Sequence, residues 1–177
     1  MKHIFLITAV FLILTIAGCA NKKTMVNNST VKVLDINKFT GTWYEIARFP
    51  HSFEKDLVGV TATYTLLDNG KIEVLNQGYK HSLKGKHKKA VGKAFIPDLQ
   101  DPAKLRVSFF WIFYSDYLVM ELDSTDYNWA VIGSSSPNYL WILSRTPKMD
   151  EQLLIDLKSK IRDRGYDLEK LVMVPQE

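Results

Sequence analysis

Gly41-Thr42-Trp43-Tyr44-Glu45 begins the first strand-like segment of the chain, and the interpretation of the fold starts from it. Further on, the chain contains Thr125-Asp126-Tyr127, and later Arg145 at the end of an apolar segment. Each of these stretches is weak evidence when it is taken alone. Their order along the chain gains weight from the strand-like segments that lie between them.

Short strand-like segments with turn residues between them follow one another at regular spacing, which is typical of an antiparallel barrel or sandwich. Asp68-Asn69-Gly70 tolerates positive φ and predicts a hairpin between two of them. The eight expected strands are Trp43–Phe49, Val60–Leu67, Lys71–Tyr79, Ala90–Ile96, Lys104–Phe110, Tyr117–Leu122, Asn128–Gly133 and Tyr139–Ser144. Eight strands close into a barrel that its side chains fill or that holds one small ligand, and closure removes exposed edges.

After these strands the period of the pattern changes. Leu153, Leu157 and Ile161 recur at helical spacing, which predicts one helix at about Met149–Asp163, packed outside the sheet. Leu171–Val174 then predicts a short final strand. The expected fold class is therefore all-β, with one α-helix near the C-terminus.

The first residues predict export from the cytoplasm. Lys2 precedes an apolar run from Ile4 to Ile16, which is too short for a bilayer core and is typical of a secretory signal, expected at residues 1–18. The run ends in Ile16-Ala17-Gly18-Cys19, which resembles a bacterial lipobox, whose cysteine becomes the lipidated first residue. A plain membrane anchor, or an ordinary signal with an incidental cysteine, is the alternative.

Cys19 is the only cysteine, so no disulfide and no redox centre is expected in the mature chain. A multiply acylated cysteine would hold the protein on a membrane. By resemblance to lipoproteins of two-membrane bacteria, Ala20 favours the outer membrane, where the anchored protein would face the periplasm. Residues 19–28 are expected to be the lipidated cysteine and a polar tether, and residues 29–177 fit one barrel domain.

The composition excludes one class of partner. Hydrophobic residues make up 46% of the chain, which is ample for a core, while the formal net charge of +4 is too small to indicate nucleic-acid binding.

With these motifs the chain resembles the lipocalin family, most closely the bacterial lipocalins that are outer-membrane lipoproteins. Gly41 to Arg48 matches the first family signature, Thr125-Asp126-Tyr127 the second, and Ile142-Leu143-Ser144-Arg145 the third. The resemblance covers almost the whole chain and implies an eight-stranded antiparallel up-and-down barrel. It also implies a membrane-anchored carrier for a small apolar ligand, in envelope lipid storage, transport or stress maintenance.

The resemblance implies that the signature residues are structural. It places Trp43 at the closed floor of the barrel, with the Arg145 guanidinium over its indole in a cation–π contact. The five donors of Arg145 can bind loop carbonyls, and Asp126 can accept nearby backbone N–H groups in its turn. The signature set that we expect to close the floor without touching the ligand is Gly41, Trp43, Thr125, Asp126, Tyr127 and Arg145.

Because side chains alternate along a strand, parity selects those that face the cavity. Counting from Trp43 and Arg145, and taking the more apolar or smaller set elsewhere, predicts the wall Ala47, Phe49, Ala62, Tyr64, Val74, Asn76, Ala94, Val107, Phe109, Tyr117, Val119, Tyr139 and Trp141. One bulge would invert a whole strand's set, and ordinary barrel core is the alternative for each residue. Glu45 also counts as inward and needs a partner, which we expect to be a Tyr or Arg side chain near the floor, or a raised pKa.

A wall of this kind suits an acyl chain, since burying each methylene gains about 0.8 kcal/mol. The expected ligand is a fatty acid or lysophospholipid, although apolar walls discriminate poorly, so sterol-like or haem-like molecules remain open. The alternative function is a structural or interaction lipoprotein whose barrel is filled by its own side chains.

Two connections frame the mouth of the barrel if the chain follows lipocalin order. One carries Lys86, Lys88 and Lys89, and the other carries Trp111 and Phe113. This basic rim and aromatic lip match the anionic head and the tail of a lipid, or the surface of an anionic membrane. The alternative is a solvated lysine loop and an aromatic cluster covered by a neighbouring loop or, in a homodimer, by a second subunit.

The sequence gives little support for catalysis, and no catalytic residue, metal ion or cofactor is expected. Gly133-Ser134-Ser135-Ser136-Pro137 is not a nucleophile elbow, and His51-Ser52-Phe53-Glu54 is not the zinc motif H-E-x-x-H. We therefore expect a binding protein and not an enzyme.

Overall fold

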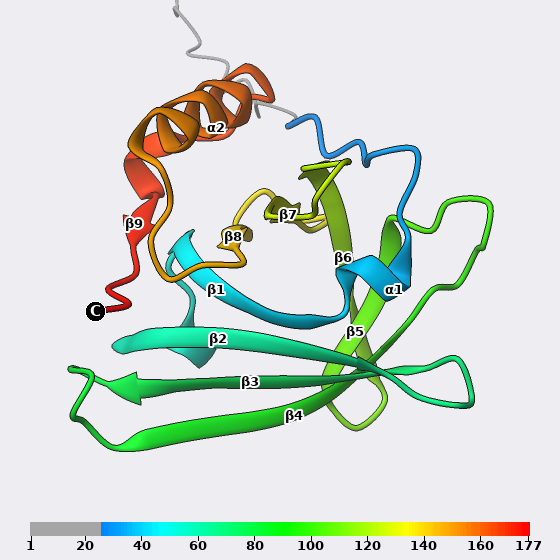
Figure 1. The fold of residues 1–177 in the computed structure, drawn as a ribbon, viewed down its shortest axis with the longest axis horizontal. Coiled ribbons are helices and arrows are strands. Elements are labelled where there is room, and N and C mark those ends of the chain that lie inside the picture. The colour runs from blue at the N-terminus through cyan, green and yellow to red at the C-terminus, as the bar shows by residue number, and fades with distance from the viewer. Residues whose placement is uncertain (1–25) are drawn as a thin grey trace, which may run out of the picture.

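The structure is a computed structural model that describes residues 26–177, so the predicted signal segment and Cys19 lie outside the described residues. One antiparallel sheet dominates this part of the chain (Figure 1). Its strands are β1 (Gly41–Arg48), β2 (Leu57–Leu66), β3 (Ile72–Lys80), β4 (His87–Phe95), β5 (Lys104–Phe110), β6 (Phe113–Leu122), β7 (Trp129–Gly133), β8 (Leu140–Ser144) and β9 (Val172–Met173). Strands β1 to β8 pair in sequence order and β1 also pairs with β8, which confirms the predicted closed up-and-down barrel.

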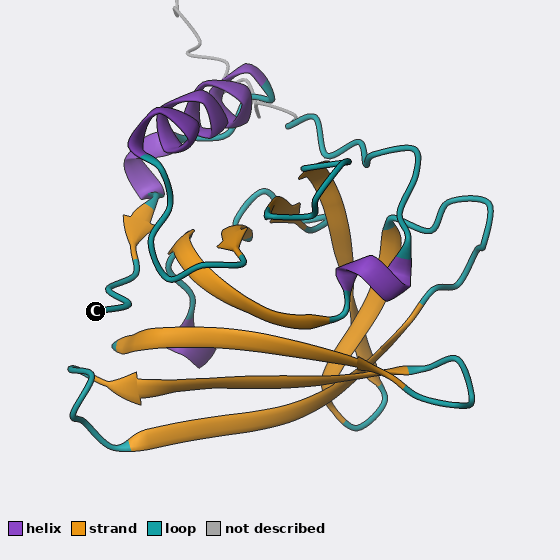
Figure 2. Ribbon diagram, viewed as in Figure 1, coloured by secondary structure: helices purple, strands orange, loops and turns teal. Residues whose placement is uncertain are grey.

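The helices of the described residues are α1 (Ile36–Phe39) and α2 (Glu151–Asp163), with the 3-10 helices η1 (Ser52–Glu54) and η2 (Leu168–Lys170). The predicted helix is α2, which begins where the Asp150 carboxylate accepts the Leu153 N–H at 2.9 Å. Figure 2 shows α2 outside the barrel, and β9 then pairs with β1 as the predicted final strand. The sequence pattern misses α1 and η1 because one turn is too short to show a helical period.

The predicted hairpin joins β2 to β3. Gly70 takes a φ of +76° there, and the Leu67 N–H donates to the Lys71 carbonyl at 2.8 Å. Positive φ is the conformation that glycine adopts without steric cost. Asp68-Asn69-Gly70 therefore sets the register of the β2–β3 pair from Leu66 opposite Ile72 to Thr61 opposite Gln77, beyond which the pairing shifts before Leu57 stands opposite Lys80.

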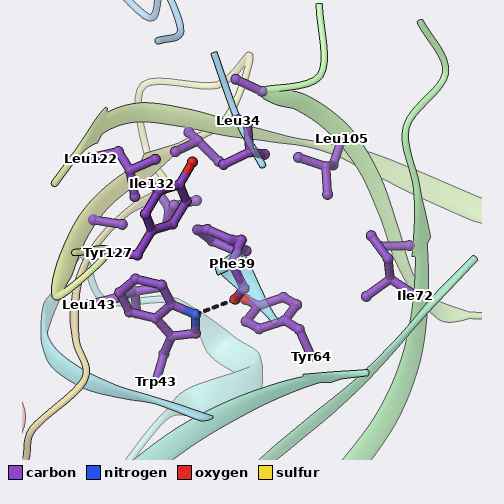
Figure 3. Packing of buried hydrophobic residues seen from close by; sticks show 14 of the residues in the cluster. Leu34, Phe39, Trp43, Tyr64, Ile72, Leu105, Leu122, Tyr127, Ile132 and Leu143 are labelled. Atoms are coloured by element: carbon purple, nitrogen blue, oxygen red, sulfur yellow. Dashed lines mark hydrogen bonds between the residues drawn. The ribbon is translucent and has the colours of Figure 1, made fainter. Parts of the chain in front are cut away.

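Two apolar clusters lie on opposite faces of the barrel wall. The inner cluster surrounds Phe39, Trp43 and Tyr64 at one end of the barrel (Figure 3). The outer cluster joins Leu157 and Ile161 of α2 to the outer faces of β1, β6, β7 and β8. The inner cluster thus closes one end of the barrel, which we call the floor, while α2 covers part of the outside.

Strand β4 is paired unequally with its two neighbours. It pairs with β3 from His87 to Ala94, but its pairing with β5 covers only Lys93–Phe95. The part of β4 before Lys93 therefore diverges from β5 toward the end of the barrel opposite the floor, which we call the mouth.

Candidate ligand-binding site

The barrel contains a cavity of about 800 Å³ that opens at the mouth. All of the strands from β1 to β8 contribute lining residues. Ligand pockets in proteins are typically about 300–1,000 Å³ in volume. The cavity is therefore large enough for one small molecule and is not filled by the protein's own side chains.

The structure places most of the predicted wall on this cavity. Those that line it are Ala62, Tyr64, Val74, Asn76, Val107, Phe109, Tyr117, Tyr139 and Trp141. Ala94 and Val119 are instead buried in the inner cluster and do not line the cavity. That part of the prediction is wrong because parity gives the face of a strand but not the depth at which the floor fills the barrel.

The prediction for Ala47 and Phe49 is also wrong, because both belong to the outer cluster. A β-bulge between Glu45 and Ala47 interrupts the pairing of β1 with β8. The extra residue, Ile46, joins Ala47 on the outer face and reverses the parity of every later residue in the strand. Alternation from Trp43 would point Ala47 and Phe49 into the barrel. After the bulge, Arg48 points inward instead.

Arg145 closes the floor. Its guanidinium lies 3.8 Å from the centroid of the Trp43 ring. The Trp43 indole N–H donates to the Phe39 carbonyl at 2.8 Å, as Figure 3 shows. The guanidinium also donates to a set of carbonyls, those of Tyr127, Thr42, Lys38, Phe39 and Thr40, at 2.7–3.3 Å. Gly41 has a φ of +92°, and a Cβ there would lie 3.3 Å from Arg145 Nη1. These contacts are all made within the chain, and neither Trp43 nor Arg145 lines the cavity.

In the second signature, Thr125-Asp126-Tyr127, the carboxylate that binds the backbone of the turn is not the predicted one. The carboxylate of Asp123, and not that of Asp126, accepts the backbone N–H groups of Thr125, Asp126 and Asn128. Asp123 stands at the start of the turn, where a short carboxylate reaches the following amides. The Tyr127 hydroxyl accepts the Asp35 N–H at 2.9 Å and so connects this turn to α1.

At the mouth, Lys88, Lys89 and Phe113 line the cavity, whereas Lys86 and Trp111 do not. Lys86 is exposed on the β3–β4 connection, and Trp111 is 83% exposed at the β5–β6 turn. The aromatic lip is thus divided between Phe113, which lines the cavity at its edge although it is 72% exposed, and Trp111, which faces solvent.

A buried polar cluster lies in the part of the wall nearer the mouth. Of its members, the sequence pattern points only to Glu45. Glu45 accepts from Arg48 Nη1 at 2.6 Å, and Arg48 Nη2 donates to the Glu54 and Leu57 carbonyls. The Glu54 carboxylate lies 2.9 Å from His51 Nε2. The bulge that turns Arg48 inward and the 3-10 helix that carries Glu54 bring these groups together. Neither leaves a periodic signal in the sequence.

The two carboxyl groups of this cluster have opposite pKa shifts. Burial, with the charge of Glu54, raises the pKa of Glu45 well above its ordinary value, and Arg48 offsets this only in part. Burial also acts to raise the pKa of Glu54, but contacts with His51 and Trp141 and the charge of Arg48 outweigh it and lower that pKa. Of the two carboxyl groups, Glu45 is therefore the weaker acid and Glu54 the stronger.

A second polar group lies between the cavity and the floor. The hydroxyls of Tyr64 and Tyr117 are 2.7 Å apart, and both rings pack against Phe39. Burial raises the pKa of each tyrosine, so both hydroxyls stay protonated at physiological pH. The bottom of the cavity is thus a neutral hydroxyl pair above an aromatic floor.

Within residues 26–177, no cluster of three or more His, Cys, Asp or Glu side chains is arranged to hold a metal ion. In the same part of the chain, no helix combines the length and apolarity that a membrane crossing needs.

Residues 34–176 of this chain match the family of the lipocalin-like domain. This chain is a lipocalin. Lipocalins bind small hydrophobic ligands, which agrees with the open cavity.

Among its relatives, this lipocalin is similar to the outer membrane lipoprotein Blc of Vibrio cholerae, with 40% identity over the full length of both chains. It is 39% identical to outer membrane lipoprotein Blc of Escherichia coli, across 96% of this chain and 93% of that protein. It is also 41% identical to temperature-induced lipocalin-1 of Arabidopsis thaliana, across 82% of this chain and 81% of that one.

Solved structures agree with the fold of this lipocalin. The cockroach allergen Per a 4 superposes with a TM-score of 0.66 at 23% identity, covering 84% of this chain and 92% of that one. Apocrustacyanin C2 gives a TM-score of 0.65 at 19% identity, covering 81% and 80% respectively. At these identities the likeness shows the fold alone.

Proposed function

We propose that this lipocalin is a lipid-anchored carrier that holds the acyl chain of one fatty acid or lysophospholipid in its barrel. The observation that supports this is the cavity of about 800 Å³, with walls built largely from Ala62, Val74, Val107, Phe109 and Leu143. Each buried methylene of an acyl chain gains about 0.8 kcal/mol there. The open interior counts against the alternative of a structural lipoprotein with a filled barrel.

The mouth supports the orientation of the ligand. Lys80, Lys88 and Lys89 lie on the cavity at this end, and no acidic residue occurs between Val74 and Pro97. Cationic side chains attract the anionic carboxylate or phosphate of a lipid. The proposed pose therefore places the head group at the lysines and the chain toward Tyr64 and Tyr117.

The place of action is part of the same proposal. The lipobox-like segment that ends in Cys19, and the names of the relatives from Vibrio cholerae and Escherichia coli, support anchoring in the outer membrane. We infer that the protein faces the periplasm and takes part in envelope lipid transport, storage or stress maintenance. Binding without chemistry is the expected activity.

A fluorescent fatty acid tests the carrier. The chain from residue 19 with Cys19→Ser should bind it saturably at one-to-one stoichiometry. Ala62→Phe places a ring in the cavity and should weaken binding at least thirtyfold, because it removes the volume that roughly 2 kcal/mol of chain burial needs. Val91→Phe is the matched control, since Val91 is 58% exposed on the outer face of β4. Absence of binding by the parent chain would favour the filled-barrel alternative.

A further inference from the structure

The turn between β5 and β6 exposes an unbroken run of large apolar side chains. In the described part of the chain, exposure ranges from 68% to 83% for Phe110, Trp111, Ile112 and Phe113. Single exposed apolar side chains are common on soluble proteins, but contiguous exposed patches mark contact surfaces for proteins or membranes. The turn is therefore a candidate contact surface.

The backbone of the turn is unfavourable for the residue at its tip. Phe110 pairs with Phe113, so Trp111 and Ile112 are the two central residues of a hairpin turn. Trp111 takes a φ of +49°, in the left-handed region, which a bulky side chain rarely adopts and which glycine or asparagine adopts more readily. Packing within the described residues does not explain a tryptophan here, because its side chain is exposed.

Cations lie close to this aromatic turn. A Cβ on Gly92 of β4 would lie 2.7 Å from the Phe109 ring, so the end of β5 packs directly against β4 at this point. Lys88 and Lys89 precede Gly92 on the same strand, about 10–13 Å away along it. Both line the mouth of the cavity, and neither takes part in an ion pair with the described residues.

An aromatic turn beside lysines matches the surface of an anionic bilayer. Tryptophan favours the head-group level of a membrane, and lysines attract anionic head groups. From Phe109 to Phe113 the only polar side-chain group is the Trp111 indole N–H. A bilayer suits this composition better than a protein partner, because a typical protein interface carries about ten hydrogen bonds.

The predicted tether is long enough to bring the turn to a membrane. Asn28 Nδ2 donates to the Ser134 carbonyl at 3.3 Å, next to the β7 residue that stands opposite Leu118 of β6. From Leu118, β6 extends about 17 Å to Phe113 at the turn. Between Cys19 and Asn28, the extended chain spans at most about 32 Å. A membrane that holds a lipidated Cys19 is therefore within reach of the turn.

We propose that the β5–β6 turn, with Lys88 and Lys89 beside it, is a docking surface for an anionic phospholipid bilayer. Trp111 and Ile112 enter the head-group region, and the lysines contact anionic head groups. Docking places the mouth of the cavity against the lipid, where an acyl chain passes between bilayer and barrel without crossing water. This contact extends the proposed carrier function but does not depend on it, since docking uses the outer surface of the mouth.

Co-sedimentation with vesicles tests docking by the chain from residue 19 with Cys19→Ser, which has no lipid anchor. One set of vesicles contains equal parts of phosphatidylethanolamine and phosphatidylglycerol, and the other contains phosphatidylcholine alone. The parent should bind the anionic vesicles at least tenfold more tightly, because each lysine near an anionic surface contributes about fivefold. Absence of binding to both sets would overturn the docking surface. Binding of a fluorescent fatty acid without vesicles tests the carrier separately.

Two substitutions at the tip locate the contact. Trp111→Asn/Ile112→Ser removes the apolar tip and keeps a residue that tolerates positive φ. It should weaken binding to the anionic vesicles at least tenfold, as expected when large apolar side chains are withdrawn from the interface. Neither residue lines the cavity, so the variant should bind the fatty acid as the parent does.

The matched control is Leu99→Asn/Ile155→Ser, which removes two exposed apolar side chains from the β4–β5 connection and from α2. It should bind the anionic vesicles as the parent does. Equal binding by the tip variant and this control would overturn the assignment to the turn. A parent dimer that the tip variant converts to monomers in sedimentation velocity would show that the turn covers a second copy, which would also overturn docking. Vesicle binding without fatty-acid binding would instead contradict the carrier and support the docking surface.

Discussion

The floor and the mouth of this barrel differ in how far their side chains are bonded and covered by the rest of the chain. At the floor, Arg145 satisfies loop carbonyls and covers the indole of Trp43, so every contact is made within the chain. At the mouth, Phe110 and Trp111 are 79% and 83% exposed, and β4 leaves β5. The contrast indicates that the floor holds the barrel closed, while apolar side chains at the mouth stay exposed in the described part of the chain.

The interior between the two ends contains both bonded and unbonded polar groups. Arg48 and Glu45 satisfy each other at 2.6 Å, as groups at the floor do, whereas Asn76 Oδ1 has no partner within the described residues. Asn76 lines the cavity beside small side chains, but this oxygen is itself buried. Polar groups of the interior thus differ in whether the described part of the chain bonds them.

The largest effect on stability is expected from a substitution at the floor. Arg145→Ala removes a cation–π contact and leaves several carbonyls without a donor, since Arg145 bonds those of Thr42, Lys38, Thr40 and Tyr127. We expect the free energy of unfolding to fall by about 3 kcal/mol, from the cation–π contact and the charge-assisted hydrogen bonds that are lost together. Urea denaturation followed by tryptophan fluorescence measures this change.

Arg162→Ala is the matched control, because Arg162 is exposed near the end of α2. Its effect should stay within about 0.5 kcal/mol. A loss below about 1 kcal/mol for Arg145→Ala would show that the floor does not depend on this side chain.

The floor is also the region that the sequence predicts best. Trp43 and Arg145 form their contact in the structure as their motifs predict, because both partners of the interaction belong to recognisable sequence signatures. The assignment of the acid in the Thr125-Asp126-Tyr127 turn fails because a short carboxylate accepts from amides that follow it, and the amides of Thr125 and Asp126 follow Asp123.

The wall is predicted less well, for physical reasons. Alternation holds along β8 and along β2 from Val60 onward, so residues such as Ala62 and Trp141 reach the cavity, as Val74 does from β3. It fails in β1 after the bulge at Glu45, where no glycine or proline marks the irregularity and Ala47 turns outward. The unpaired amide of Asn76 depends on contacts across three strands, and a sequence contains no direct record of such contacts.

Lysines at the mouth and lysines on the floor side should differ in their effect on ligand binding. Reversal of Lys86, Lys88 and Lys89 to Glu should weaken binding of an anionic lysophospholipid at least tenfold more than binding of a zwitterionic one. Each lysine near an anionic surface contributes roughly 1 kcal/mol, so the rim should discriminate by head-group charge. Titration of both lipids by fluorescence displacement gives the two dissociation constants.

Reversal of three lysines on the floor side, Lys32, Lys38 and Lys71, changes the net charge equally and is the control. All three are exposed and lie outside the cavity lining. If both triple variants lower affinity for the anionic lipid to the same extent, net charge and not the mouth would be responsible.

The most gradual effect concerns Glu45 in the wall. Because its pKa in the folded protein is raised above the ordinary 4.5, the folded state binds more protons than the unfolded state between these two pKa values. The parent protein therefore loses stability as pH rises through this window, by about 1.4 kcal/mol for each unit that separates the two values. Glu45→Gln stays neutral, so its stability relative to the parent should increase from pH 5 to pH 8 in urea denaturation. A difference that does not change with pH would show that Glu45 is ionised beside Arg48. Glu54→Gln should behave in the opposite sense, because the pKa of Glu54 is lowered and its contribution disappears only as pH falls below 4.5.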